Sequence, residues 1–381
     1  MKIVHIGVGS FPPVYSPLGG AIQRRIAELA RAQSRSGHDV TVFSPGYEDT
    51  SQRLDDVAVH YVGLRSPPPL VQLEFQARVV ARLRRSRQAF DVVHFHSQPE
   101  GALTSRAIPG LKVLSYDNFY FRRGMKSGLY PFYRHALRAF DVLLPCSHYC
   151  EQKSLSYWAI RPARSRVLFN GVNLDQFRVD PAAGQRERDS VGTRKRVILY
   201  LGRVCRQKGT DTLLEAFSAV QRADADVDLV IAGPISQFAQ RDVSERDDWL
   251  RRMHAAPATY LGLVPDDRLA GLLNLADVFV MPTRELEMFG MAAVEAQACG
   301  TPVVASDHGG LRETVPAHVG LRFAPGDVSQ LEDALIRLLM SPDLRASLGM
   351  RAQENARQYS WEEIARQLDD IYQEFIGRGA R

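Results

Sequence analysis

The chain alternates short apolar runs with longer segments in which apolar residues recur every three or four positions. Runs such as 3–7 and 197–201 are typical of buried parallel strands. The segment that carries Ile22, Ile26 and Leu29 has the spacing of an amphipathic helix. Strands that alternate with helices in this way predict an α/β protein with parallel sheets.

The strand and helix pattern occurs twice along the chain. Predicted strands cover residues 3–7, 40–43, 57–62, 91–95, 112–115, 142–144, 197–201, 228–232, 259–261, 278–281 and 303–305. We therefore predict two doubly wound domains, 1–175 and 176–360, with a polar linker in 172–194. The segment 361–376 has one apolar face and predicts a final helix.

Composition narrows the class of protein without identifying it. The 381 residues are 45% hydrophobic and carry a net charge of +5, but the basic residues form no recognisable nucleic-acid module. The first strand follows Met1 directly, and no apolar run approaches the ~18–20 residues that span a bilayer. Four scattered cysteines favour reduced thiols. We expect a cytoplasmic protein with at most peripheral contact with the inner membrane face, and no nucleic-acid partner.

The segment 278–316 reads as strand, loop, helix and strand, and it carries two acids. Glu287 lies in the loop, and Glu295 lies about two turns later within an apolar helix. A buried carboxylate needs a partner, so Glu295 either pairs with a neighbouring group or, with Glu287, faces a polyhydroxylated ligand. Gly290 would let backbone N–H groups of Phe289, Gly290 and Met291 approach an anion at the helix start.

Two glycine-containing turns could bind phosphate. Arg203 and Lys208 lie in G-R-x-x-x-x-K-G, between a strand and a helix, where two cations suit a diphosphate. The alternative is a solvated basic loop. Gly19 and Gly20 precede the first helix, and they form either an anion site or a plain flexible loop.

The fingerprint of a dinucleotide-binding dehydrogenase is incomplete. Gly7 and Gly9 give G-x-G, but Pro12 stands where the third small residue is required. A hydride-transfer enzyme is therefore disfavoured.

Further polar residues follow strands in the first half of the chain. His94 and His96 could begin a zinc site, but no third ligand has useful spacing, so we expect a structural His94 and a His96 that contacts an acceptor. Tyr116, Asp117 and Asn118 follow the next strand. Asp117 is either a base or hydrogen-bonding group or the start of an Asx turn.

Two of these motifs resemble those of a known family. E-M-F-G-M-A-A-V-E-A-Q-A-C-G-T-P-V-V-A and G-R-x-x-x-x-K-G are similar to the signatures of retaining glycosyltransferases of the GT-B fold, glycosyltransferase family 4. The resemblance implies two Rossmann-like domains that face a central cleft, and a last helix, 361–381, that crosses back to the N-terminal domain. The family's histidine that contacts sugar or acceptor is replaced here by Tyr116-Asp117.

The resemblance also implies roles for the site residues. Arg203 and Lys208 would neutralise the leaving nucleoside diphosphate, Glu287 would hold the transferred sugar, and Glu295 would bind ribose. With Glu287, the two cations form the expected catalytic set. Gly19, Gly20 and the 289–291 backbone complete the donor site. We expect no metal and no cofactor, because side-chain cations and helix dipoles replace a divalent ion.

The expected reaction is retaining transfer of a sugar to an acceptor hydroxyl, with a UDP-sugar as donor. A GDP-sugar donor, a nucleotide-sugar epimerase on the same fold and a non-enzymatic binding subunit remain alternatives. The acceptor would be a carbohydrate, a lipid-linked molecule or a small metabolite.

Overall fold

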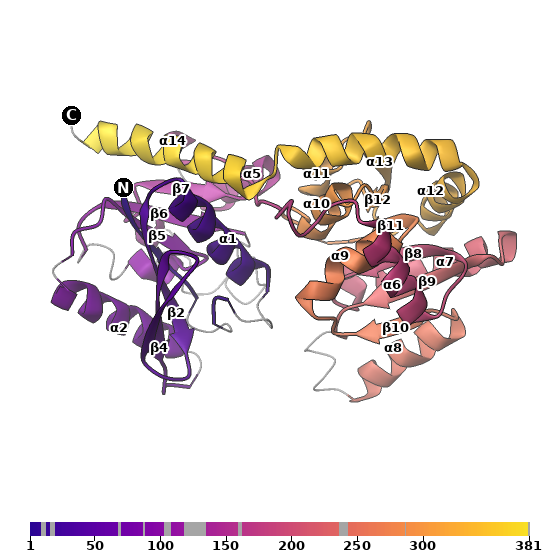
Figure 1. Ribbon diagram of the computed structural model, residues 1–381, viewed down its shortest axis with the longest axis horizontal. Helices are drawn as coiled ribbons and strands as arrows, with labels where there is room; N and C mark the ends of the chain where they lie inside the picture. The colour runs from indigo at the N-terminus through magenta and orange to yellow at the C-terminus, as the bar shows by residue number, and fades with distance from the viewer. Residues whose placement is uncertain are drawn as a thin grey trace. The chain divides into compact units, whose positions relative to one another are not determined.

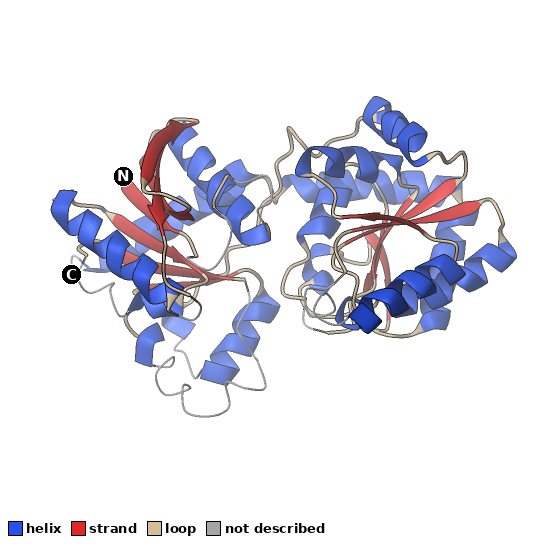
Figure 2. Cartoon of the chain, turned by 90° about the horizontal axis from the view of Figure 1, so that it is seen from below, coloured by secondary structure: helices blue, strands red, loops and turns tan. Residues whose placement is uncertain are grey.

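The computed structural model describes residues 1–8, 13–15, 20–67, 70–86, 88–102, 108–117, 135–158, 162–235, 243–285 and 287–379. The chain divides into two compact units. Unit 1 comprises Met1–Gly171 and Trp361–Arg381, and unit 2 comprises Val172–Ser360. Each has a mainly parallel sheet with helices on both faces (Figures 1 and 2), so the predicted α/β class with two Rossmann-like domains is confirmed.

Unit 1 contains a seven-stranded sheet in the order β3-β4-β2-β1-β5-β6-β7, in which only β3 is antiparallel to its neighbour. Its strands are β1 (Lys2–Ile6), β2 (Asp39–Gly46), β3 (Thr50–Leu54), β4 (Val57–Gly63), β5 (Val92–His96), β6 (Leu111–Tyr116) and β7 (Val142–Pro145). Its helices are α1 (Ala21–Arg35), α2 (Val71–Ser86), η1 (Pro99–Gly101), α5 (His148–Trp158), η3 (Pro162–Arg164) and α14 (Trp361–Gly379).

The final helix belongs to unit 1. Figure 1 shows α14, in yellow, beside α1, in indigo, and the two helices contact each other. The α14 residues Ile364, Leu368 and Tyr372 are fully buried. This spacing of four residues places one apolar face of α14 on the unit.

Unit 2 contains a six-stranded parallel sheet in the order β10-β9-β8-β11-β12-β13. Its strands are β8 (Arg196–Leu201), β9 (Val227–Ala232), β10 (Thr259–Gly262), β11 (Val278–Met281), β12 (Val303–Ser306) and β13 (Gly320–Phe323). Its helices are α6 (Pro181–Val191), η4 (Arg206–Lys208), α7 (Thr210–Ala223), α8 (Val243–Ala255), α9 (Asp266–Leu275), α10 (Met291–Ala298), α11 (Leu311–Thr314), α12 (Val328–Met340) and α13 (Pro342–Arg357).

Strand order reverses once in each parallel sheet, and the reversal positions the candidate sites. In unit 1 it lies between β1 and β5, and in unit 2 it lies between β8 and β11. Loops diverge at such a switch point, and they leave a crevice at the carboxyl ends of the strands where ligands bind.

An aspartate precedes three of the strands and serves the same purpose each time. Asp91 Oδ2 accepts the N–H of Lys2 at 2.7 Å, and Asp141 Oδ2 accepts that of Lys112 at 2.8 Å. In unit 2, Asp277 Oδ2 accepts the N–H of Val197 at 2.9 Å. In each case the carboxylate satisfies a donor that begins or flanks a neighbouring strand.

The chain passes from unit 1 to unit 2 between Gly171 and Val172, at the start of the polar linker predicted for 172–194, but the prediction is wrong for Pro181–Val191, which form α6. Asp180 caps the helix by accepting the N–H of Ala183, Pro181 occupies the first turn, and Gly192 ends it in the left-handed conformation. The helix packs closely on α9, where a Cβ at Gly184 would lie 2.6 Å from the Asn274 carbonyl oxygen. Mostly polar residues fold here because a neighbouring helix supplies the contacts.

None of the described helices has the length and apolar character needed to cross a bilayer. All four cysteines are buried free thiols.

Candidate functional site

The two loops at the unit 2 switch point meet through one ion pair. Lys208 ends η4, in the loop after β8, and Glu287 lies in the loop after β11. Lys208 Nζ lies 2.6 Å from Glu287 Oε2, and the two side chains are 24% and 14% exposed. The contact joins one cation and one acid from the two predicted donor motifs.

Backbone hydrogen bonds hold the same loops together. The N–H groups of Arg284 and Glu285 both donate to the Gln207 carbonyl oxygen, at 3.1 and 3.3 Å. The Arg284 guanidinium also contacts α7, where it donates to Thr212 Oγ1 at 2.8 Å and forms an ion pair with Asp211 at 3.0 Å. Sequence reasoning assigned no role to Arg284, because its partners lie 72 residues or more away.

The residue after Lys208, Gly209, must be a glycine for two reasons, its backbone conformation and its close contact with the neighbouring loop. Its φ is 70°, and a Cβ there would lie 1.8 Å from the carbonyl oxygen of Pro282. Any side chain would therefore push the turn away from the loop that carries Glu287.

The start of α10 is held in a similar way. Gly310 donates its N–H to the Glu287 carbonyl oxygen at 2.8 Å, and a Cβ on Gly310 would lie 2.1 Å from the Met288 oxygen. Gly290 is the N-cap residue, with φ 91°, and Met291 is the first helical residue. The first N–H groups of a helix have no acceptor within it, so this end can bind an anion.

The other predicted donor residues differ in exposure. Phe289 is buried, and its ring packs edge-on against Tyr359 with centroids 5.6 Å apart. Glu295 is 4% exposed, and Cys299, one turn further along, has its pKa raised to about 12 by burial and by the charge of Glu295. Glu295 thus keeps a carboxylate inside an apolar helix, as the sequence indicated.

Arg203 is exposed at the end of β8. Its carbonyl oxygen accepts the Tyr200 hydroxyl at 2.7 Å. The pKa of Tyr200 is raised mainly by burial, and among the smaller influences Arg203 lowers it while Glu287 raises it. Arg203 and Glu287 therefore both lie within electrostatic range of one buried ring.

Two polar residues at this edge were missed by sequence reasoning. Thr283 follows β11 after Pro282, and Ser306 ends β12. Both are buried, and their hydroxyl oxygens have no hydrogen-bond partner among the residues that the structure describes. A hydroxyl residue at the carboxyl end of a parallel strand was the available signal.

The predicted acceptor residues lie at the unit 1 switch point. His96 ends β5 opposite Ser115 of β6, and Tyr116 and Asp117 follow at once. Asp117 pairs with the wholly buried Arg25 of α1, and Arg25 also donates to Ser115 Oγ at 3.2 Å. Tyr116 is buried, and its pKa is raised chiefly for that reason.

Two predicted residues, Gly19 and Asn118, lie outside the described residues. Gly20 is described: it is the exposed N-cap residue of α1, and its N–H donates to Gln23 Oε1 at 3.1 Å.

The structure adds a third histidine, His5, to His94 and His96, and its spacing in the sequence did not reveal it. It stands opposite His94 across the β1–β5 pair, and ligand-capable atoms of His5, His94 and His96 all lie within 4.8 Å of one another. Hydrogen bonds nevertheless occupy most of the ring nitrogens. His94 Nδ1 contacts the Tyr372 hydroxyl at 2.6 Å, and His94 Nε2 contacts Ser115 Oγ at 2.7 Å.

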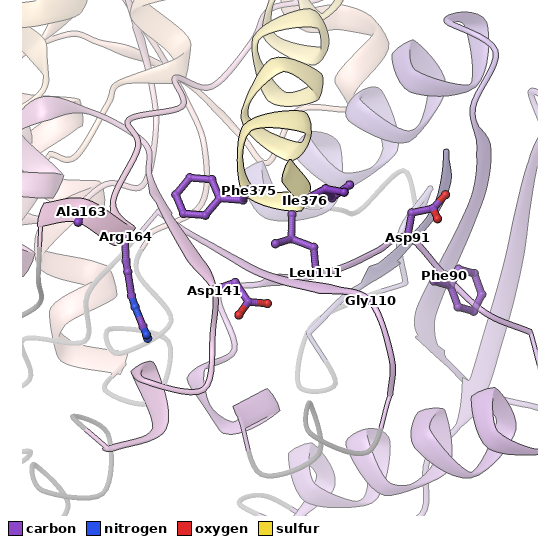
Figure 3. A pocket seen from close by; sticks show the side chains of 9 residues that line it. All are labelled: Phe90, Asp91, Gly110, Leu111, Asp141, Ala163, Arg164, Phe375 and Ile376. Carbon is purple, nitrogen blue, oxygen red and sulfur yellow. The ribbon is translucent and has the colours of Figure 1, made fainter. Parts of the chain in front are cut away.

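A cavity of about 680 Å³ lies at the opposite edge of the same sheet, where β5, β6 and β7 begin. Figure 3 shows Phe375 and Ile376 of α14 above it, with Asp91 and Asp141 across from them. Those two carboxylates accept the N–H groups of Lys2 and Lys112 near the amino ends of neighbouring strands. The predicted acceptor residues follow the carboxyl ends of the strands, so this cavity is separate from them.

Two family models match the chain. The model described as Glycosyltransferase Family 4 matches residues 19–176, and the model described as Glycosyl transferases group 1 matches residues 184–355. Together they cover most of both units.

Relatives match over nearly the whole length. The chain is 30% identical to the GDP-mannose-dependent alpha-(1-6)-phosphatidylinositol monomannoside mannosyltransferase of Mycobacterium tuberculosis, covering 94% of this chain and 95% of the relative. It is 28% identical to the phosphatidyl-myo-inositol mannosyltransferase of Mycobacterium leprae, covering 98% of each. The structure of Anabaena HepE with UDP and glucose aligns with a TM-score of 0.77 at 20% identity, covering 97% of this chain and 99% of HepE. The chain therefore belongs to glycosyltransferase family 4 and is a hexosyltransferase with the GT-B fold.

Proposed function

We propose that the enzyme transfers a hexosyl group from a nucleoside diphosphate hexose to an acceptor hydroxyl, with retention of anomeric configuration. The observation that carries the proposal is the 2.6 Å contact between Lys208 and Glu287. It brings one cation and one acid from separate motifs to one edge of the unit 2 sheet, and we assign them to phosphate and sugar binding, respectively.

In this proposal the ion pair prepares the site for the donor. An incoming diphosphate takes hydrogen bonds from Lys208, and the released Glu287 carboxylate accepts bonds from sugar hydroxyls. Charge-assisted bonds of this kind contribute about 1.5–3 kcal/mol each. The exposed Arg203 and the α10 start at Gly290 and Met291 add positive potential near the same diphosphate.

Glu295 is proposed to bind the ribose hydroxyls. It is buried inside α10, five residues after the N-cap Gly290. Thr283 and Ser306 offer hydroxyl groups without partners at the adjacent strand ends.

The chemistry needs no separate metal in this proposal. Charge develops on the leaving diphosphate in the transition state, where Lys208, Arg203 and the helix start stabilise it most. The leaving phosphate can accept the proton of the attacking hydroxyl, so a dedicated side-chain base is not required on this face of the sugar.

The relatives guide the choice of donor and acceptor. One relative is named as a GDP-mannose-dependent enzyme, and both mycobacterial relatives are named as mannosyltransferases of phosphatidylinositol compounds. We therefore propose GDP-mannose ahead of the UDP-sugar expected from sequence, and a polyol or lipid-linked polyol as acceptor. Contact with a lipid acceptor would be peripheral to the membrane.

Donor hydrolysis tests this function without knowledge of the acceptor. Purified protein is incubated with GDP-mannose and, separately, UDP-glucose, in the presence of EDTA. We expect slow release of the nucleoside diphosphate from one donor, and ¹H NMR should detect the α-anomer of the sugar first.

Three results would contradict the proposal. Release of the β-anomer would show inversion, activity that only magnesium restores would show a metal requirement, and conversion to an epimeric nucleotide sugar would show an epimerase. If neither donor is bound or hydrolysed, the proposed donor class is wrong.

A further inference from the structure

The buried histidine at the unit 1 switch point has one nitrogen without a partner. His96 is 1% exposed, and its Nε2 lies 2.9 Å from His5 Nδ1. Its Nδ1 is buried and makes no hydrogen bond with any residue that the structure describes. Leaving a buried polar atom without a partner is unfavourable, so this nitrogen is a candidate to bind a further group.

A chain of hydrogen bonds that begins at α14 determines which ring nitrogen carries the proton in His5 and in His96. Gln33 donates from Nε2 to Asp369 Oδ1 at 3.0 Å, because a carboxylate accepts, and this fixes the amide orientation. Gln33 Oε1 must then accept from His5 Nε2, at 2.8 Å. The proton of a neutral His5 is therefore on Nε2, and its Nδ1 is an acceptor.

The position of the proton on His5 determines the position of the proton on His96. His5 Nδ1 can only accept, so His96 Nε2 donates to it. Burial is the main cause that lowers the pKa of His5 to about 4, and it also lowers the pKa of His96 well below its ordinary value, so both rings are neutral near pH 7. His96 therefore carries its one proton on Nε2 and presents a bare lone pair at Nδ1.

Two neighbouring groups also lack partners within the described part of the chain. Arg25 has a buried Nε–H that makes no hydrogen bond, and its charge is close enough to lower the pKa of His96, although burial and the other two histidines contribute more. Ser97 Oγ is buried and unpartnered, and Ser97 has φ 50°, a strained value for a residue with a side chain. Such strain is characteristic of functional sites.

The buried groups without hydrogen-bond partners indicate which kind of ligand would bind there. A hydroxyl group can donate to His96 Nδ1 and also accept from a neighbouring donor, whereas a carboxylate or phosphate dianion cannot donate. The positive charge of Arg25 is already balanced by its ion pair with Asp117. The site therefore favours a neutral hydroxyl over an anionic group.

We propose that His96 Nδ1 accepts a hydrogen bond from a hydroxyl of a neutral polyol acceptor, and that the Asp369–Gln33–His5 chain is a positioning device that keeps this nitrogen bare. The proposal rests on the transferase function proposed above. It makes His96 part of the acceptor site and assigns α14 an indirect role through Asp369.

Histidine ¹⁵N NMR of the full-length protein tests the proposal without any activity. The His96 signals are assigned by their loss in His96→Phe. We expect a protonated Nε2 and an unprotonated Nδ1 in the free protein at pH 7, and a shift of the Nδ1 signal on addition of myo-inositol or methyl α-mannoside. A protonated Nδ1 would overturn the proposal, and so would an Nδ1 signal that neither polyol changes, as expected if only water binds there.

Variants separate the positioning role from general damage. Gln33→Met should allow His5 and His96 to exchange tautomers, so that the His96 Nδ1 signal moves toward the protonated position. Gln367→Met, which removes an α14 amide that donates to Glu363, is the matched control and should leave the signal in place. Equal spectra for the two variants would contradict the positioning role.

Transfer and hydrolysis distinguish failure of this inference from failure of the function. With the donor identified by hydrolysis, His96→Phe should lower the ratio of transfer to hydrolysis at least tenfold, mainly through a higher KM for the polyol. An unchanged ratio would remove His96 from the acceptor site while the transferase function stands. Loss of all donor hydrolysis in the unaltered enzyme would instead refute the function.

Discussion

At the scale of single residues, the Lys208–Glu287 contact yields the sharpest expectation. Lys208→Ala removes a cation that would stabilise the leaving diphosphate and leaves Glu287 without its 2.6 Å partner. Loss of about 1.5–3 kcal/mol predicts a roughly 10- to 150-fold lower kcat, with a smaller change in donor affinity. Steady-state kinetics on the identified donor measure both quantities.

The matched control lies two residues earlier. Arg206 is exposed in the same turn, and its backbone carbonyl oxygen accepts the Gly209 N–H, a bond that a side-chain substitution keeps. Arg206→Ala removes an equal charge and should change kcat by less than about threefold, as surface charges usually do. Equal losses in the two variants would mean that net charge, rather than the Lys208 position, matters.

These residues also show what sequence can and cannot predict at this scale. Lys208 and Glu287 stand in motifs whose spacing named them, and the structure brings them into contact. His5 carried no such signal, because it becomes a neighbour of His94 only when β1 pairs with β5. Long-range pairing, rather than local pattern, assembles the histidine cluster.

At the scale of elements, α14 is tied to unit 1 by polar contacts as well as by its apolar face. The Tyr372 hydroxyl contacts His94 Nδ1 at 2.6 Å, and Glu374 forms two bonds with Arg166. Gly171 packs against Trp361 so closely that a Cβ would lie 2.3 Å from the indole ring. The last helix is therefore an integral part of the unit.

Removing one hydroxyl should weaken this attachment. Tyr372→Phe leaves His94 Nδ1 buried without a partner, which should lower the free energy of unfolding by about 1–3 kcal/mol. Glu363→Gln on the same helix breaks an ion pair with the largely exposed Arg366 and should cost at most about 1 kcal/mol. Urea denaturation followed by circular dichroism compares the two, and similar midpoints would contradict the role of the buried hydroxyl.

The helices and strands differed in how well they could be predicted from sequence. The buried strands were predictable because parallel strands covered on both faces are continuously apolar. α6 was not, because its apolar pattern is weak and its stability comes from packing on α9 and from an ion pair between Glu187 and Arg268 at 2.6 Å. Its signals were the terminal ones, Asp180-Pro181 at the start and Gly192 at the end.

At the scale of the whole molecule, the buried histidines should make the stability of unit 1 more sensitive to acid than that of unit 2. His5, His94 and His96 all lie in unit 1, and no histidine of unit 2 is buried among the residues that the structure describes. Burial is the largest cause of the lowered pKa of each of the three. Arg25 from α1 disfavours their charged forms further, while Gln33 stabilises the charged form of His5.

Unit 1 should therefore lose stability as the pH falls below about 6.5. Unfolded histidine binds a proton near pH 6.5, whereas folded His5 resists protonation until about pH 4, so the unfolded state holds more protons between these values and stability rises with pH there. A lowering from 6.5 to about 4 corresponds to a contribution on the order of 3 kcal/mol from His5 alone. Thermal denaturation between pH 7.5 and pH 4.5 should show a transition that moves to lower temperature as the solution is acidified, and His5→Gln should flatten that dependence. A midpoint that is independent of pH over this range would show that the three rings are not held neutral inside the folded unit.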